Sequence, residues 1–487
     1  MANPVVATTA GRVRGGMTDG VARFLGIPYA AAPVGALRFA APSPVKAWDG
    51  VREASRQGPT APQATNPPLP GLDLAGMTGQ GWRKGEEYLT VNVWTPDPGG
   101  SGLPVLVFIH GGGYVTGAGL VPACDGTAFA RSWIVLVSIN YRLGIEGFLH
   151  LDGAASNRGL RDQIAALGWV ADNIAAFGGD PGQVTVFGES AGGASIACLL
   201  ASPLARGLFQ RAIVASGHPE MVRPSALART LTAGLAAALG VPATAAAFAA
   251  KTSEELIAVQ GAAWGLDLRD ENGLDPFCGF LPYTPVYGDE VLPGPPAAAI
   301  AAGAGSEVAL LAGTARQEVN LTMIPAGIYD STDDAQAVAT LSATHPDAAQ
   351  ILDGYGLGRD GNIAGHVLTA AMTDLIFRLP TRRLAAAHTG PTHLFEFGWP
   401  SPALDGRLGA CHSLILPFVF DTLPTVTGPD GMAGPNPPHA LAGELYRIWS
   451  DFTVAGKLTW PEYGPDRQIL WADTPSAVRT DDAPATT

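Results

Sequence analysis

The chain has 487 residues, of which 47% are hydrophobic and only 15% are charged. This balance allows a large buried core and excludes extended disorder, which needs low hydrophobicity and high charge. The net charge of -14 argues against a nucleic-acid partner and against binding to anionic membrane surfaces, because both favour basic patches. No stretch of about 20 apolar residues is free of breakers, so we expect no membrane span.

Four cysteines are spread along the chain without a C-x-x-C pattern, which indicates neither a zinc site nor a disulfide framework; they are Cys124, Cys198, Cys278 and Cys411. The first fifteen residues show no basic segment followed by an apolar one. We therefore expect no signal peptide and a cytoplasmic protein. The sequence leaves the oligomeric state open.

Apolar runs alternate with longer helical patterns, which predicts an α/β fold with a mostly parallel sheet covered by helices. Four runs have the length of a buried strand and are apolar on both faces, as in a sheet with helices on each side; they span residues 104–109, 133–139, 184–187 and 308–311. Apolar residues recur at steps of three and four from Ile164 to Phe177, which indicates a helix. Residues 222–258, rich in Ala and Leu, also read as helices.

Three segments rich in Pro and Gly interrupt this pattern, at residues 59–82, 283–305 and 421–439. Long loops in a compact domain are often functional, so these segments could form the roof of a pocket. The alternative is that each is a surface loop without a role.

The third apolar run ends in the pattern G-x-S-x-G at residues 188–192, with Ser190 at its centre. A plausible helix follows from Ala194 to Leu200. A strand, a tight glycine-bounded turn and a helix are what the nucleophile elbow of a serine hydrolase requires. The turn exposes the serine Oγ, and the start of the following helix favours developing negative charge. A glycine-rich turn with a solvated serine is the alternative.

The first apolar run ends in H-G-G-G at residues 110–113, the pattern of the oxyanion-hole loop of lipases and esterases. Glycines there let bare backbone N–H groups approach a substrate oxygen closely. We expect Gly112 and Gly113 to be donors, with the N–H of Ala191 as the third. A flexible turn is the alternative for this motif alone, but two such motifs in this order are hard to obtain by chance.

A serine nucleophile needs a histidine base and an acid that orients it, in the chain order Ser, Asp or Glu, His. His412 stands out because it precedes the apolar residues 414–420, whereas His439 lies in a Pro-rich stretch. Glu318 follows the fourth apolar run by a short turn, and loops after strand ends collect catalytic groups. From spacing alone the acid stays open between this glutamate and three competitors, Asp330, Asp333 and Asp334.

The sequence resembles the type B carboxylesterases, the carboxylesterase/cholinesterase family, and above all bacterial members related to para-nitrobenzyl esterase. The most specific block of the match runs from residues 177–181 into the elbow at Ser190. The resemblance implies an α/β-hydrolase fold in one catalytic domain over residues 1–487, with loops and helical insertions as a pocket roof. It spans nearly the whole chain and also includes residues 24–29, 33–39, 89–96 and 140–144.

The resemblance also assigns the reacting groups. The family's acid lies in a G-x-x-x-x-E turn, which falls on Glu318. Its histidine precedes a P-F-V-F segment, which selects His412. The family's two-glycine oxyanion pair falls on Gly112 and Gly113, and Ala191 completes it.

Further positions carry expectations that rest on the resemblance. Ser216 matches a serine that supports the acid, and Phe397 and Trp399 match a segment that helps to form the pocket wall. Many relatives carry a disulfide whose two positions fall here on Ala61 and Tyr88. The joint loss of both cysteines agrees with a reducing compartment.

The expected reaction is two-step acyl transfer, with an acyl-enzyme on Ser190 and His412 as the base. The substrate is expected to be a small neutral ester, and neither a metal nor an organic cofactor is implied. Activity should fall as His412 protonates, near a pKa of about 6.5 if the group is unperturbed. An amidase or a carbamate hydrolase would use the same residues, and a non-catalytic binding protein of this fold is a further alternative.

Overall fold

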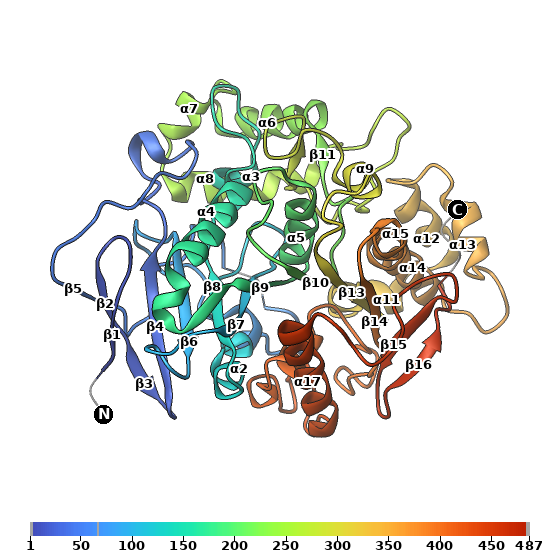
Figure 1. Cartoon of the computed structure of the whole chain (residues 1–487). Coiled ribbons are helices and arrows are strands. Elements are labelled where there is room, and N and C mark those ends of the chain that lie inside the picture. Colours follow the sequence, from blue (N-terminus) through green and yellow to red (C-terminus); the bar gives the residue numbers. More distant parts are fainter. Residues whose placement is uncertain (1–2, 66–67, 484–487) are drawn as a thin grey trace.

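A mixed sheet of 11 strands runs through the molecule (Figure 1). The computed structural model describes residues 3–65 and 68–483. In chain order the strands of this sheet are β3 (Gly16–Thr18), β4 (Val21–Pro28), β6 (Thr90–Thr95), β7 (Leu103–Ile109), β8 (Val135–Ile139), β9 (Gly179–Glu189), β10 (Arg211–Ala215), β13 (Ala309–Ala315), β14 (Thr392–Phe397), β15 (Gln468–Ala472) and β16 (Ala477–Thr480). Their order across the sheet is β16-β15-β14-β13-β10-β9-β7-β8-β6-β4-β3. The strands from β15 to β8 are parallel, and antiparallel pairs form both edges.

Helices cover both faces of the sheet (Figure 1). The longer ones are α4 (Arg158–Asn173), α5 (Ala191–Ala201), α6 (Ser225–Leu239), α8 (Ser253–Gln260), α12 (Asp334–Ser342), α14 (Ala364–Thr373), α15 (Leu379–Ala387) and α17 (His439–Ala455). The shorter ones are α1 (Ala75–Thr78), α2 (Thr127–Arg131), α3 (Gly144–Phe148), α7 (Ala245–Ala249), α9 (Pro296–Ala301), α10 (Asn320–Met323), α11 (Ile328–Ser331), α13 (Ala348–Gly354) and α16 (Ile415–Val419). Within the part of the chain that the structure describes, none of these helices combines the length and the apolar character that crossing a bilayer demands.

Two hydrophobic cores sandwich the sheet, and β7 contributes to both. Successive side chains of a strand point to opposite faces. Val105 and Val107 therefore pack in the core that also contains residues of α4 and α5. Leu106 and Phe108 pack in the other core, with residues of α16 and α17. Because both faces are covered, the central strands read as unbroken apolar runs, which confirms the predicted parallel sheet.

The predicted strands exist, but their boundaries differ from the expectation. β9 begins at Gly179, and β13 continues through Ala315 instead of ending at residue 311. β8 begins only at Val135. Trp133, which the apolar run placed in this strand, has a φ of 62° and is 60% exposed. A left-handed backbone cannot continue a strand, so this residue belongs to the turn before β8.

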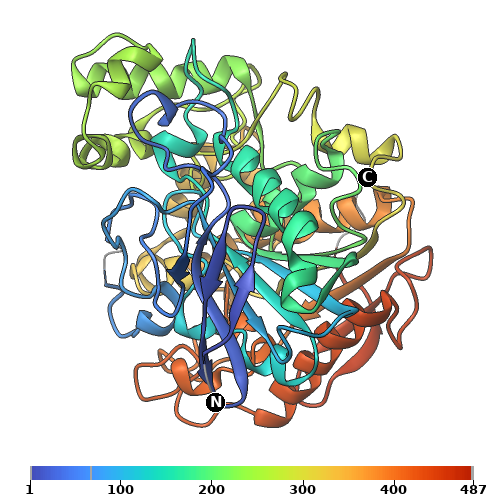
Figure 2. The same cartoon turned by 60° about the vertical axis from the view of Figure 1, so that its left-hand side comes forward.

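Two small sheets and the predicted excursions complete the chain. β1 (Val5–Ala7), β2 (Arg12–Arg14) and β5 (Val51–Glu53) form a separate three-stranded sheet, whose dark-blue strands lie at the front in Figure 2. β11 (Arg223–Pro224) pairs with β12 (Val286–Tyr287). The Pro- and Gly-rich segments contain α1, β12, α9 and a 3-10 turn at Leu423–Thr425. Residues 66 and 67 of the first segment lie outside the described part, and a roof over a pocket stays a prediction.

Candidate active site

Ser190 occupies a strained turn between β9 and α5. Its φ of 56° and ψ of -125° are unusual for a residue with a side chain. The backbone N–H of Ser190 donates to the carbonyl of Ala215 at 2.9 Å, which holds the turn against β10. A Cβ atom on Gly192 would lie 2.0 Å from the carbonyl oxygen of Ile109, so only glycine fits there. This geometry is that of a nucleophile elbow.

The glycine loop at residues 110–113 lies directly beside this elbow. A Cβ atom on Gly111 would meet the Cβ of Ser190 at 3.0 Å, so the two turns are in contact. Gly112 and Gly113 have φ values of 103° and 59°, in the region that favours glycine. Among the described residues, no backbone or side-chain acceptor receives a hydrogen bond from the N–H of either glycine. These donors are therefore free for an external acceptor.

His110 anchors this loop. Its Nδ1 donates to the carbonyl of Gly111 at 2.8 Å, and its ring stacks on Tyr141 at a centroid distance of 4.4 Å. The hydroxyl of Tyr141 donates to the His110 carbonyl at 2.7 Å. Burial lowers the pKa of His110 to about 4, so the ring is neutral at physiological pH. The side chain holds the loop in place and is distinct from the histidine that faces the acid.

That histidine is His412, whose Nδ1 lies 2.6 Å from Oε2 of Glu318. The other oxygen of Glu318 accepts hydrogen bonds from the Ser216 hydroxyl at 2.6 Å and from the backbone N–H of Ala315 at 2.7 Å. The Glu318 side chain is completely buried, so these three donors satisfy a carboxylate that water does not reach. The structure thus brings Glu318, His412 and Ser216 together.

The competing acids have other roles. Asp330 forms an ion pair with Arg407. Asp333 caps α12 by accepting a hydrogen bond from the backbone N–H of Gln336 at 2.8 Å, and Asp334 is an exposed residue of the first turn of that helix. His439, expected in a loop, is instead the exposed first residue of α17.

Glu189 is a site residue that the sequence reasoning missed. Its Oε1 lies 3.3 Å from Nε2 of His412 and accepts a hydrogen bond from the Ser413 hydroxyl at 2.8 Å. It is buried, and burial raises the pKa of its carboxyl. Its position in the sequence could have indicated this role, since Glu189 is the last residue of β9 and directly precedes Ser190.

The two carboxylates control the charge of His412. Burial of the ring lowers its pKa, but the negative charges of Glu189 and Glu318 outweigh this effect and raise the pKa to about 9. The imidazolium form is thus favoured in the free protein. The condition for a value near 6.5, an unperturbed ring, is therefore not met, because the site holds two acids around the ring and not one.

Aromatic side chains surround the site unevenly. The ring of Phe377 lies 5.0 Å from the ring of His412, centroid to centroid. Phe397 and Trp399 are buried and instead pack on Phe418, at centroid distances of 5.4 and 5.2 Å. Their role as pocket wall stays a prediction.

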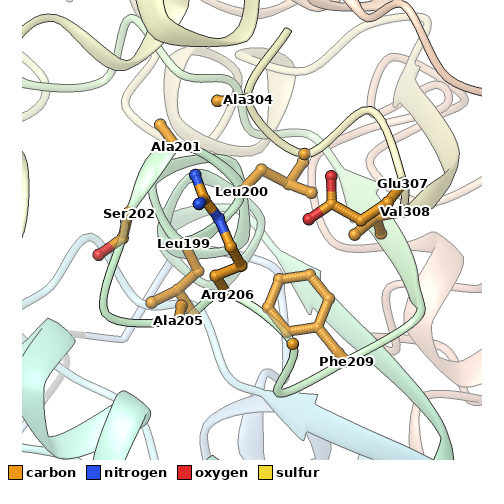
Figure 3. A pocket seen from close by; sticks show the side chains of 12 residues that line it. Leu199, Leu200, Ala201, Ser202, Ala205, Arg206, Phe209, Ala304, Glu307 and Val308 are labelled. Carbon is orange, nitrogen blue, oxygen red and sulfur yellow. The ribbon is translucent and has the colours of Figure 1, made fainter.

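A cavity of about 20 Å³ lies at the far end of α5 (Figure 3). Leu200 and Ser202, from the end of this helix, line it together with Glu307 and Val308, which precede β13. Ser190 stands before the first residue of the helix, and a helix of 11 residues is about 16 Å long. The cavity has room for about one water molecule and is separate from the reacting groups.

A model of the carboxylesterase family matches residues 2–477 of this chain. The chain belongs to the carboxylesterase family. The para-nitrobenzyl esterase of Bacillus subtilis is 36% identical over 99% of this chain and 97% of that protein. The phenmedipham hydrolase of Pseudarthrobacter oxydans is 36% identical over 95% of this chain and 93% of that protein. A solved PNB esterase structure superimposes with a TM-score of 0.84 at 33% identity, covering 99% of this chain and 98% of that one.

Membership of the carboxylesterase family confirms the α/β-hydrolase fold and the resemblance found in the sequence. This carboxylesterase is a carboxylic ester hydrolase. The comparisons give no sign of a non-catalytic binding role.

Proposed function

We propose that this carboxylesterase hydrolyses small neutral esters through an acyl-enzyme on Ser190, with His412 as base and Glu318 as the orienting acid. The observation that carries this assignment is the 2.6 Å contact between Glu318 Oε2 and His412 Nδ1, beside the strained turn at Ser190. With Nδ1 donating to the acid, Nε2 is the atom that takes the proton of the Ser190 hydroxyl.

The reaction has two halves. Ser190 Oγ attacks the ester carbonyl while His412 accepts its proton, and the alcohol leaves with a proton returned by the imidazolium. Water then attacks the acyl group, with His412 again as base, and the acid product and free serine result. Glu318, and Glu189 on the other ring nitrogen, stabilise the imidazolium charge that forms in each half.

Gly112, Gly113 and Ala191 are the proposed oxyanion donors. The first two have free N–H groups on a loop in contact with Ser190, and Ala191 begins α5 directly after the serine. A helix start leaves its first N–H groups without intrahelical partners. Each such donor typically contributes about 2.7–4 kcal/mol to lowering the barrier.

A carbamate is the second substrate class, and one observation favours it over an amide. The phenmedipham hydrolase relative matches 95% of this chain at 36% identity. The same serine, base and oxyanion donors serve esters and carbamates, since both react by acyl transfer. Matched aryl esters, carbamates and amides with one common leaving group would rank the three classes by kcat/KM.

A pair of serine variants tests the central assignment. Ser190→Ala should abolish hydrolysis of a small aryl ester, because it removes the proposed nucleophile. Ser195→Ala is the matched control, since Ser195 lies buried on the helix that follows Ser190 and its hydroxyl accepts a hydrogen bond from Gln163 at 3.1 Å. Full activity of Ser190→Ala would exclude the assignment.

We also propose that the protein is cytoplasmic and that it acts on small molecules and does not bind nucleic acid. All four cysteines are free, which supports a reducing compartment such as the cytoplasm. The net charge of -14 favours a small-molecule substrate over nucleic acid. Separating cells into cytoplasmic and exported fractions and measuring the esterase in each would check the location.

A further inference from the structure

A continuous helical segment, residues 364–387, passes beside the candidate site, and one turn in its middle is π-helical instead of α-helical. α14 ends at Thr373, the π-helical turn η5 spans Asp374–Arg378, and α15 begins at Leu379. Figure 1 shows α14 and α15 beside β13 and β14. Single π-helical turns inside α-helices occur frequently at functional sites.

Pro380 lies two residues after the π-helical turn and removes one backbone donor from this segment. Proline has no N–H, so it cannot donate to the carbonyl four residues earlier, which is that of Ile376. Nε2 of His218 lies 2.7 Å from this carbonyl oxygen. Since a carbonyl only accepts, Nε2 must carry the proton and donate. The imidazole therefore donates to this carbonyl from outside the helix.

The carbonyl held by His218 directly precedes the residue that touches the catalytic base. Phe377 follows Ile376, and its ring lies 5.0 Å from the ring of His412. His218 itself stands two residues after Ser216, which binds Glu318. One short turn after β10 thus reaches Glu318 through the side chain of Ser216, and the carbonyl that precedes Phe377 through the side chain of His218.

Buried ion pairs also hold the π-helical turn. Arg378 pairs with Asp374 and, at 3.1 Å, with Glu396. In the described chain, the acidic group compact enough to hold a cation consists of Glu396, Asp481 and Asp482. Arginines already neutralise these carboxylates, so the cluster is an anchor for the helix and not a metal site.

We propose that His218 is a positioning residue of this esterase, which holds the Ile376 carbonyl and thereby sets Phe377 against His412. The inference rests on the proposed role of His412 as base. A fixed Phe377 restricts the ring of the base to the plane in which Nδ1 faces Glu318, and small displacements of a catalytic group cost rate.

The chemistry of His218 suits a permanent donor. It is 2% exposed, and its Nδ1 has no hydrogen-bond partner among the described residues. A proton on Nδ1 would be a buried donor without an acceptor, which disfavours the charged form. Burial accordingly lowers the pKa of His218 to about 4, so the hydrogen bond persists across the working pH range.

Two variants of His218 with side chains of similar shape test the hydrogen bond that this residue donates. Gln and Met have similar side chains, but only Gln can donate to the Ile376 carbonyl. With sites counted by organophosphonate titration, we expect His218→Met to lower kcat about tenfold with little change in KM, and His218→Gln to keep kcat within about threefold. His393→Met is the control, since His393 is a buried histidine at the amino end of β14 whose Nδ1 has no hydrogen-bond partner in the described part of the chain. Wild-type kcat in His218→Met, or equal losses in the Met and Gln variants, would overturn the proposal.

A double-mutant cycle identifies the route of the effect. If His218 acts through Phe377, then His218→Met should cause no further loss in a Phe377→Ala background, whereas its effect should add to that of Ser216→Ala. Additive losses with Phe377→Ala would contradict the proposal.

Should His218→Met not fold, His218→Asn takes its place, because its amide is too short to reach the carbonyl. His412→Ala distinguishes failure of the proposed function from failure of the present inference. Full activity of His412→Ala would refute the role of His412 as base. An inactive His412→Ala together with an unaffected His218→Met would refute only the role of His218.

Discussion

Oε1 of Glu189 lies 3.3 Å from Nε2 of His412, while Oε2 of Glu318 lies 2.6 Å from Nδ1 of the same ring. The proposed base is thus held between two buried carboxylates, one on each nitrogen. A histidine in this setting is easily charged, and its neutral, reactive form becomes dominant only at higher pH.

The pH profile should show this effect. Because the pKa of His412 is raised to about 9, kcat/KM should fall as the pH drops through a value well above 6.5. Glu189→Gln removes one negative charge, so it should move this acidic limb down by about 1–3 pH units. The exposed Glu271→Gln serves as control. An acidic limb that stays in place in Glu189→Gln would contradict the electrostatic role of Glu189.

Ser216→Ala should weaken the support of the acid. It removes one of two hydrogen bonds to Oε1 of Glu318, and a bond to a charged group contributes about 1.5–3 kcal/mol. We expect kcat to fall about tenfold while KM changes little, measured by steady-state kinetics. Ser202→Ala is a suitable comparison, because among the described residues the buried Ser202 hydroxyl has no partner. Equal kcat in both variants would argue against this support.

The two glycines of the oxyanion loop should respond differently to alanine. A Cβ on Gly112 would lie 2.2 Å from the carbonyl oxygen of Thr116, whereas a Cβ on Gly113 would meet nothing closer than Leu281 Cδ2 at 3.6 Å. Gly112→Ala should therefore displace the loop and remove about 2.7–4 kcal/mol of transition-state stabilisation. Gly113→Ala should be milder in both kcat and Tm. The reverse order would show that the loop is not held as described.

The buried ion pairs of Arg382, a residue of α15, should contribute more to the free energy of unfolding than the exposed ion pair of Arg383. Arg382 is almost fully buried against Glu396 and Asp481, and Arg382→Met should cost about 3–5 kcal/mol of unfolding free energy. Arg383→Met removes an exposed pair with Glu220 and should cost at most about 1 kcal/mol. Denaturant titration measures both. A similar cost for the two variants would contradict the importance of burial.

Local sequence patterns predicted the sheet because its central strands are covered on both faces. Strands buried in this way have unbroken runs of apolar residues. The end of β13 escaped prediction. Ala312, Gly313 and Ala315 are too small to look like a strand, yet a Cβ on Gly313 would lie 2.4 Å from Phe395 of β14. The lack of a side chain is what lets the neighbouring ring pack there.

The candidate site could be read from the sequence where its motifs are contiguous, and not where it depends on tertiary packing. The elbow and the glycine loop were visible in the sequence. Spacing alone left Asp330 and its neighbours open as the acid, and only the family resemblance favoured Glu318. Phe377 and His218 had no local signal, because their contacts join segments that are distant in the chain.

The most direct measurement is the mass of the peptide that carries Ser190 after brief exposure to an organophosphonate ester. We expect one stoichiometric adduct on Ser190, with a labelling rate that follows the titration of His412 and is largely lost in His412→Ala. Absence of an adduct in an active preparation, or an adduct on another residue that abolishes ester hydrolysis, would contradict the acyl-enzyme on Ser190.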